Sequence, residues 1–210
     1  DMNTSVIGQE CIDELASELR LKQKVAKITE RAMNGELEFE SALRERVALL
    51  TGLESSVIPR VIANRITHTP GARILISTLR GHGVYTALVS GGFTEFTDPI
   101  SRAIGFDEHR ANRLDIINGK LTGRVKDPIL GREAKRQALI ELRELFSLQD
   151  QETLAIGDGA NDLDMIKEAG LGLAFRAKPA VASAAHAQLL HADLTALLYA
   201  QGYPRTSWIE

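Results

Sequence analysis

The sequence predicts an α/β fold in which a mostly parallel sheet is covered by helices on both faces. Short, uncharged, β-rich runs at residues 84–89, 153–156 and 171–175 alternate with helical segments. This alternation is typical of parallel strands joined by helical crossovers. Residues 6–68, which precede these strands, are predicted to be almost entirely helical. The 210 residues, of which 44% are hydrophobic, suffice for a buried core.

Three helices are predicted in this first segment, over residues 7–30, 36–50 and 55–65. The first carries apolar residues at four-residue spacing with charges between them, as an amphipathic helix does. Asn34-Gly35 separates it from the second helix. Pro59 lies near the first turn of the third helix, where a proline is tolerated.

Helices and strands are predicted to alternate in the remaining chain. Asn118-Gly119 lies between two β-capable runs and predicts a hairpin over residues 114–125. Ligands bind at the carboxyl ends of parallel strands, so three segments are expected to meet there: residues 1–5, 90–92 and 157–162. The other helices are predicted from Pro70 to Gly81, after Gly92 to Ile104, over residues 133–146 and 160–169, and from Pro179 onward.

Composition excludes several classes of protein. Lys and Arg number 25 against 28 Asp and Glu, a net charge of −3, which argues against a nucleic-acid partner. No apolar run reaches the roughly 20 residues of a membrane helix, and no signal peptide is visible. The lone Cys11 is predicted to be a buried hydrophobe and fits a cytoplasmic protein. Because the chain opens with Asp1-Met2, we expect further residues, including a strand, to precede it.

The stretch from Gly157 to Asp162, GDGAND, is the most informative for chemistry. It places two carboxylates and an amide at a strand-to-helix turn, and Mg²⁺ prefers such oxygen ligands. The alternative is an Asx turn that only caps the helix. Ser90-Gly91-Gly92 offers a hydroxyl and backbone N–H groups that can cradle a phosphate, or forms a simple tight turn. Lys135 taken alone would be a surface lysine.

In chain order, the sequence has an Asp, a Ser at a strand end, a Lys and a Gly-Asp-Gly-x-Asn-Asp turn. This order resembles the four motifs of the haloacid dehalogenase superfamily of phosphohydrolases. More specifically, four segments between residues 1 and 175 are similar to the phosphoserine phosphatase family: DMNTSVIGQECIDELA, MNGELEFESALRERVALL, LVSGGF and IGDGANDLDMI. The resemblance implies a Rossmann-like core of residues 1–5 and 69–210, with a helical cap domain inserted at residues 6–68.

The resemblance also implies a role for each matching residue. Asp1 would be the nucleophile that forms an aspartyl-phosphate, and Mg²⁺ would offset the repulsion between its carboxylate and the phosphate. The implied metal ligands are Asp1, the backbone carbonyl of Asn3, and Asp158, with Asp162 holding the metal's water shell or orienting Lys135. The implied phosphate contacts are Ser90, the Gly91 N–H, Lys135 and Asn161, the last of which could instead position the attacking water.

The cap would select the substrate. The resemblance implies that Glu10 binds the ammonium of phosphoserine and that Arg46 binds its carboxylate as a bidentate fork. Phe39 lies seven residues before Arg46 on the same helical face and would shield the site from water. Met33 would line the pocket. The alternative makes Phe39 a core residue and the two charged side chains ordinary solvated helix residues.

The sequence departs from the family pattern at Asn3, where the family has an aspartate. That aspartate protonates the departing serine oxygen and then deprotonates the attacking water, and an amide can do neither. Loss of such help costs roughly 10²- to 10⁴-fold in rate, so the site is predicted to be correctly built but slow. The substitution is either engineered or a natural variation.

Four functions are weighed on this basis. The first is Mg²⁺-dependent hydrolysis of the small molecule phosphoserine. The second is action on another small phosphate ester, as a phosphatase or phosphotransferase. The third, a signalling receiver domain, conflicts with the roughly 60-residue helical insertion after Asp1. The fourth takes Asn3 at face value, as a phosphoserine-binding protein without turnover.

Overall fold

The computed structural model describes residues 1–33 and 36–210, without the side chain of Met33. In this part of the chain, strands form two three-stranded sheets with the orders β1-β2-β3 and β4-β5-β6. All neighbouring strands pair in parallel except β2 and β3, which form an antiparallel hairpin. The strands are β1 (Ala87–Phe93), β2 (Glu108–Ile117), β3 (Lys120–Lys126), β4 (Leu154–Gly157), β5 (Leu171–Phe175) and β6 (Ala187–Leu189).

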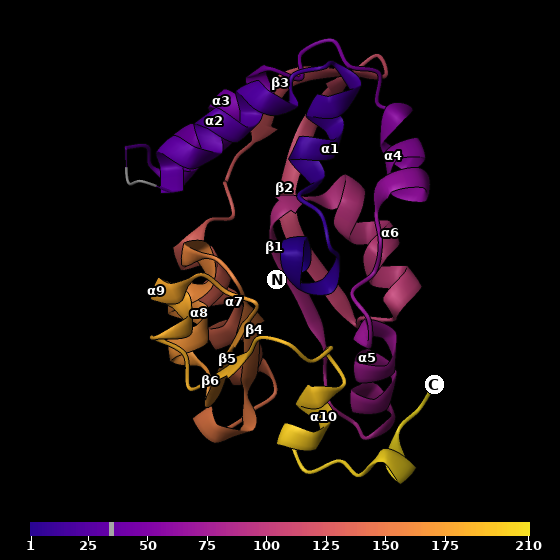
Figure 1. The fold of residues 1–210 in the computed structure, drawn as a ribbon, viewed down its shortest axis with the longest axis vertical. Coiled ribbons are helices and arrows are strands. Elements are labelled where there is room, and N and C mark those ends of the chain that lie inside the picture. The colour runs from indigo at the N-terminus through magenta and orange to yellow at the C-terminus, as the bar shows by residue number, and fades with distance from the viewer. Residues whose placement is uncertain (34–35) are drawn as a thin grey trace.

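The helices form two groups (Figure 1). In the upper part of the view, four helices lie around the β2–β3 hairpin: α1 (Cys11–Glu18), α2 (Lys22–Met33), α3 (Phe39–Ala48) and α4 (Val57–Arg65). The others flank the two sheets below: α5 (Ala72–Gly81), α6 (Thr94–Ile104), α7 (Arg132–Leu145), α8 (Leu163–Glu168), α9 (Pro179–Ala182) and α10 (Ala196–Ala200). Within the described ranges, none of these helices is long and apolar enough to cross a membrane.

The segment predicted as a cap returns to the point at which it leaves the core. Ile7 and His68 form an isolated antiparallel bridge, and the Thr69 N–H donates to the Val6 carbonyl at 2.9 Å. The core is continuous across this junction, because buried side chains of the upper helices and of the sheet belong to one cluster. Cys11 is fully buried within it, as predicted.

Three predicted boundaries are wrong. The single helix over 7–30 is two helices, α1 and α2, because Arg20 adopts a left-handed φ of 60° and ends the first. β1 begins at Ala87 rather than at Val84 and continues through Ser90–Gly92, which therefore lie inside the strand. The helix predicted from Ala160 begins with a 3₁₀ turn, η3 (Ala160–Asp162), before α8. The elements that were not predicted are β6, α10 and the short segments η1 (Met2–Val6), η2 (Asp150–Glu152) and η4 (Arg205–Ser207). The Asn34-Gly35 break lies outside the described residues.

Candidate active site

The turn after β4 folds around the carboxylate of Asp162, which is fully buried. Its Oδ2 accepts the backbone N–H groups of Asp158 at 3.2 Å and Gly159 at 3.1 Å. Gly157 is required here, because a Cβ atom would lie 2.4 Å from the Asp162 side chain. Asp162 thus accepts N–H groups of residues that precede it, as the third helical residue does in a capping box, and not of following residues as in an Asx turn. These bonds fix the direction of its carboxylate.

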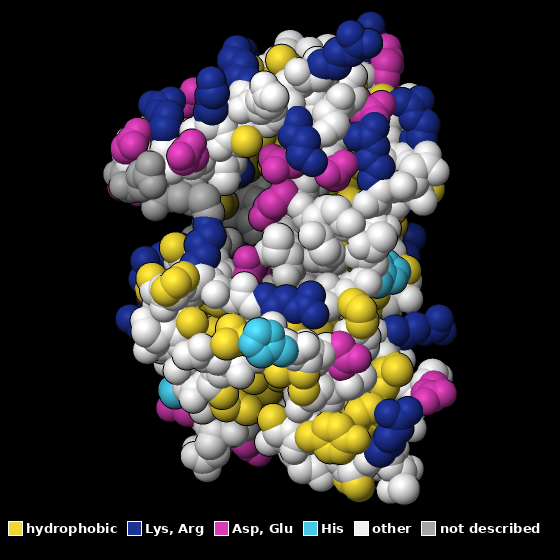
Figure 2. All heavy atoms as spheres, in the orientation of Figure 1, with side chains coloured by type: hydrophobic (Ala, Val, Ile, Leu, Met, Phe, Trp, Pro, Cys, Tyr) yellow, Lys and Arg dark blue, Asp and Glu magenta, His cyan; other side chains and the backbone are white. Residues whose placement is uncertain are grey.

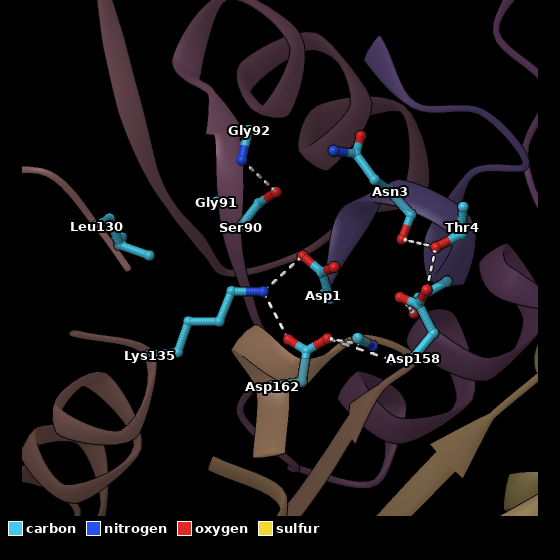
Figure 3. A network of polar contacts seen from close by, with 12 residues as sticks. Asp1, Asn3, Thr4, Ser90, Gly91, Gly92, Leu130, Lys135, Asp158 and Asp162 are labelled. Carbon is cyan, nitrogen blue, oxygen red and sulfur yellow. Dashed lines mark hydrogen bonds and ion pairs between the residues drawn. The ribbon is translucent and has the colours of Figure 1, made fainter. Parts of the chain in front are cut away.

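Lys135 from α7 is buried at the centre of the site (Figure 3). Its Nζ lies 2.6 Å from Asp162 Oδ1 and 2.9 Å from Asp1 Oδ1. Although burial opposes ionisation of Asp162, the Lys135 ammonium holds the pKa of this carboxyl below its usual value. Lys135 is thus no surface lysine: it is a fixed positive charge between two carboxylates.

The side chain of Asp1 lies at the carboxyl end of β4, because the Asp1 nitrogen donates to the Ile156 carbonyl at 2.9 Å. Carboxylate oxygens of Asp1, Asp158 and Asp162 all lie within 4.8 Å of one another. Burial, followed by the charge of Asp162, raises the pKa of Asp158. Asp1 Oδ1 is buried, and its contact is the ion pair with Lys135 Nζ at 2.9 Å. Three clustered carboxylates facing this lysine keep an excess of negative charge and of oxygen donors, which fits a divalent cation.

Hydroxyl groups next to Asp1 orient Asp158. Thr4 Oγ1 donates to Asp158 Oδ2, and Ser5 Oγ donates to Oδ1 at 3.4 Å. Thr4 is in the left-handed region with φ 54°, and its Oγ1 also lies 2.8 Å from the Asn3 carbonyl. The two predicted metal-binding segments are therefore linked directly through Thr4.

Asn3 and the end of β1 form the next part of the site. Ser90 is fully buried, and its Oγ accepts the Gly92 N–H at 3.0 Å. A Cβ atom on Gly92 would lie 3.2 Å from Ser90 Oγ and 3.5 Å from Asn3 Nδ2, so the Asn3 amide lies close to this end of the strand. Asn3 Oδ1 is buried and has no hydrogen-bond partner among the residues that the structure describes.

Phe39 at the start of α3 lies over Gly91 of β1. A Cβ atom on Gly91 would lie 3.0 Å from Phe39 Cζ and 3.7 Å from Asn161 Nδ2, and one on Gly131 would lie 3.3 Å from Phe39 Cδ1. The ring packs partly buried against the core and lies close to both Gly91 and Gly131. Figure 2 shows the same face hollowed between α2–α3 above and α7–α9 below, with acidic side chains gathered at the hollow.

Glu10 and Arg46 are partly buried, which favours a role in the site over that of ordinary solvated charges. Burial, reinforced by the negative charge of Asp158, raises the pKa of Glu10 to about 7, and Arg46 opposes the shift. Burial also lowers the pKa of Arg46, against the charge of Glu10. The Arg46 guanidinium is hydrogen-bonded to the Ala42 carbonyl and to Thr29 Oγ1. The side chain of Met33 lies outside the described residues.

The raised pKa of Glu10 predicts a pH-dependent stability. The folded protein binds the proton of the Glu10 carboxyl more tightly than the unfolded chain does. The stability gained from this tighter binding is fully present below about pH 4.5 and is lost as the pH rises through about 7. Glu10→Gln is therefore expected to raise the free energy of unfolding at pH 8 by about 1–3 kcal/mol. Urea unfolding from pH 4 to 8 measures this gain. Glu30→Gln, an exposed change on α2, is the control, and equal profiles for both variants would contradict the prediction.

Asn112 in β2 was not predicted as a site residue. Its buried amide donates to the carbonyls of Gly91 at 2.9 Å and Leu130 at 3.2 Å, and its Oδ1 accepts the Leu130 N–H at 2.6 Å. The side chain thereby ties the end of β1 to the loop that precedes α7 and Lys135. An asparagine within a strand, where this residue is disfavoured, is the only signal that the sequence offers.

Comparison with known proteins agrees with this geometry. Residues 7–167 match the family described as haloacid dehalogenase-like hydrolase. A phosphoserine phosphatase from Streptomyces coelicolor is 44% identical over 205 residues, which cover 98% of this chain and 50% of that protein. The chain thus spans about half the length of this curated relative.

Two solved structures are similar over 95% of both chains. One is a phospho-aspartyl intermediate analogue of phosphoserine phosphatase, with a TM-score of 0.89 and 40% identity. The other is a substrate-bound phosphoserine phosphatase complex, with a TM-score of 0.89 and 39% identity.

Proposed function

Because the chain belongs to the haloacid dehalogenase-like hydrolase family, we propose that it hydrolyses O-phospho-L-serine to L-serine and phosphate. One observation carries this proposal above the others. The carboxylates of Asp1 and Asp162 meet around the buried Lys135 ammonium, and Glu10, one of the two charged cap residues, is electrostatically coupled to Asp158 of the same cluster. A phosphate site and an amino-acid site are then adjacent.

Asp1 is the nucleophile in this proposal. Its carboxylate oxygen forms a bond to phosphorus while the bond from phosphorus to the serine oxygen breaks, which leaves an aspartyl-phosphate. The serine oxygen takes a proton from solvent, because Asn3 cannot donate one. Water then attacks phosphorus, loses a proton to solvent and releases phosphate with the Asp1 carboxylate restored. Lys135, held by Asp162, lies 2.9 Å from Asp1 Oδ1 and compensates the charge of the phosphoryl group.

The last residues of β1, Ser90–Gly92, bind the phosphoryl oxygens. Ser90 Oγ accepts the Gly92 N–H, so its own hydrogen remains available to a phosphoryl oxygen. The Gly91 N–H is a second donor, and the Asn161 amide lies close to it. These neutral N–H and O–H donors would stabilise the negative charge that develops on the phosphoryl oxygens, and they add no further buried cation.

Mg²⁺ is the cation that we propose for the acidic cluster. Asp1, Asp158 and the Asn3 carbonyl would hold it, with Asp162 orienting Lys135 or holding the ion's water shell. When bound, Mg²⁺ offsets the repulsion between the Asp1 carboxylate and the phosphate dianion. Small oxygen-rich sites of this kind suit Mg²⁺ better than transition metals.

Glu10 and Arg46 select the amino acid in this proposal, as partners of the substrate's ammonium and carboxylate. Phe39 closes the site over Gly91 and limits the access of water. The protein would act on this small molecule in the cytoplasm, in keeping with a lone, buried cysteine. Asn3 favours a second candidate, a phosphoserine-binding variant without useful turnover, because the amide exchanges no proton.

A substrate panel tests the proposal. Phosphate release is measured with Mg²⁺ from L-phosphoserine, O-phosphoethanolamine and phosphoglycolate, for the protein as it stands and for Asn3→Asp. We expect L-phosphoserine to be preferred, because it alone offers both an ammonium and a carboxylate. Tight binding of L-phosphoserine with no release by either protein would favour the binding variant, and a preference for another ester would overturn the substrate assignment.

Metal binding is expected to stabilise the fold through the acidic cluster. A ligand at 100 times its Kd adds about 2.7 kcal/mol, so saturating Mg²⁺ should raise the Tm by several degrees relative to EDTA. Asp158→Asn should lose most of this increase, because it removes one of the proposed ligands. Asp150→Asn, a change at an exposed carboxylate, should keep it. An unchanged increase in Asp158→Asn would rule out this residue as a ligand.

A further inference from the structure

Thr29 in α2 holds the Arg46 guanidinium from outside its own helix. Arg46 Nε donates to the Ala42 carbonyl at 3.2 Å, one turn back in α3. Arg46 Nη1 donates to Thr29 Oγ1 at 3.3 Å. Thr29 therefore connects α2 to the guanidinium that the proposed function assigns to the substrate carboxylate.

The Thr29 hydroxyl has a defined direction. Its Oγ1 donates to the Val25 carbonyl at 3.2 Å, four residues earlier in α2. Because a hydroxyl has a single hydrogen, this bond leaves only its lone pairs for the guanidinium. The fully buried Val25 side chain anchors that turn of the helix in the core. Thr29 is thus a fixed acceptor.

Among the residues that the structure describes, these two contacts leave N–H groups of Arg46 without a hydrogen-bond partner. A guanidinium has five N–H donors, and Ala42 and Thr29 take one on Nε and one on Nη1. One hydrogen remains on Nη1 and two remain on Nη2. One N–H from each of these nitrogens can bind the two oxygens of a carboxylate.

A neutral acceptor has a specific advantage next to Glu10 and Asp13. Both carboxylates interact electrostatically with Arg46 and attract its side chain. Thr29 holds the guanidinium without neutralising it, so its positive charge stays available to a ligand.

We propose that Thr29 is a positioning residue that determines specificity, because it orients the Arg46 fork toward the carboxylate of the amino-acid phosphate. The inference rests on the proposed function and adds a residue outside the motifs that define it. It predicts that loss of the hydroxyl weakens recognition of the carboxylate and leaves recognition of the phosphate unchanged.

The test compares Thr29→Val, which keeps the shape and removes the acceptor, with Thr29→Ser, which keeps the hydroxyl. Both are made in the full chain carrying Asn3→Asp. We expect Thr29→Val to raise the KM for L-phosphoserine about ten-fold, with kcat changed less than two-fold. The inhibition constant of inorganic phosphate, which has no carboxylate, should stay within two-fold. Thr29→Ser should restore the parent KM.

Ser17→Ala is the matched control, because Ser17 Oγ makes the same four-residue bond to the Asp13 carbonyl in α1. Thr29→Ala replaces Thr29→Val if the valine variant fails to fold. An unchanged KM, or a parallel rise in the inhibition constant of phosphate, would overturn the role of Thr29 while the proposed function stands. If the Asn3→Asp protein releases no phosphate from L-phosphoserine, the proposed function fails, and the role of Thr29 fails with it.

Discussion

Asn3→Asp is expected to accelerate phosphate release from L-phosphoserine by about 10²- to 10⁴-fold. The departing serine oxygen is a poor leaving group unless it receives a proton, and the amide of Asn3 cannot supply one. The Asn3 side chain lies beside residues 90–92 of β1, and its Oδ1 is buried. Burial raises the pKa of a carboxyl group, so an aspartate at this position would be protonated more readily than an exposed one.

The acceleration is measured as the initial rate of phosphate release at saturating Mg²⁺. Asn64→Asp, the same chemical change on the exposed surface of α4, should leave the rate unaltered. The Kd of L-phosphoserine should change far less than kcat, because the amide and the carboxyl group have nearly the same shape. A rate for Asn3→Asp within ten-fold of the parent rate would show that proton transfer at this position is not what limits the reaction.

Lys135→Met is expected to abolish phosphate release and to lower the free energy of unfolding by about 3–5 kcal/mol. Lys135 and Asp162 are both completely buried, and Asp1 completes the group with a side chain that is 7% exposed. Methionine fills a similar volume but leaves two buried carboxylates without their cation. Removal of one partner of a buried ion pair costs far more than the pair itself contributes.

Urea unfolding followed by circular dichroism measures this loss in EDTA, so that bound metal does not mask it. Lys167→Met, a change at an exposed lysine of α8, should alter stability by less than about 0.5 kcal/mol. Lys135→Met/Asp162→Leu tests the cause: it should regain part of the lost stability because one unpaired carboxylate is gone, while activity stays absent. A single variant as stable as the parent would mean that the carboxylates simply take up protons or water.

Sequence patterns predicted the elements that depend mainly on interactions between residues close together in the chain. The Asn118-Gly119 turn, the strand at residues 171–175 and the helix at residues 55–65 required only turn chemistry and periodicity. The helix predicted over residues 7–30 shows the limit of such patterns. Its four-residue spacing ends at Leu19, and apolar residues resume at Leu21 and Val25 in a different phase. The left-handed φ of Arg20 separates the two helices, and the second packs separately on the core.

The candidate site divides in the same way. The order of the motifs pointed to the segments that carry Asp1, Ser90 and Asp158. Their carboxylate and hydroxyl groups are visible in the sequence itself. Nothing in the sequence around Asn112 or Thr29 distinguishes them from ordinary polar residues. Their importance comes from partners distant in the chain, such as the Leu130 backbone and the Arg46 guanidinium.

The sequence by itself determined the class of fold, the family and the residue types available for chemistry, since these depend on periodicity and on the order of short motifs. Only the tertiary structure decided that Lys135 is buried between two carboxylates, that Phe39 reaches Gly91, and that burial alters the acidity of Glu10. The physical reason is that ion pairing, close packing and desolvation depend on distances between segments, and folding sets these distances through the whole core.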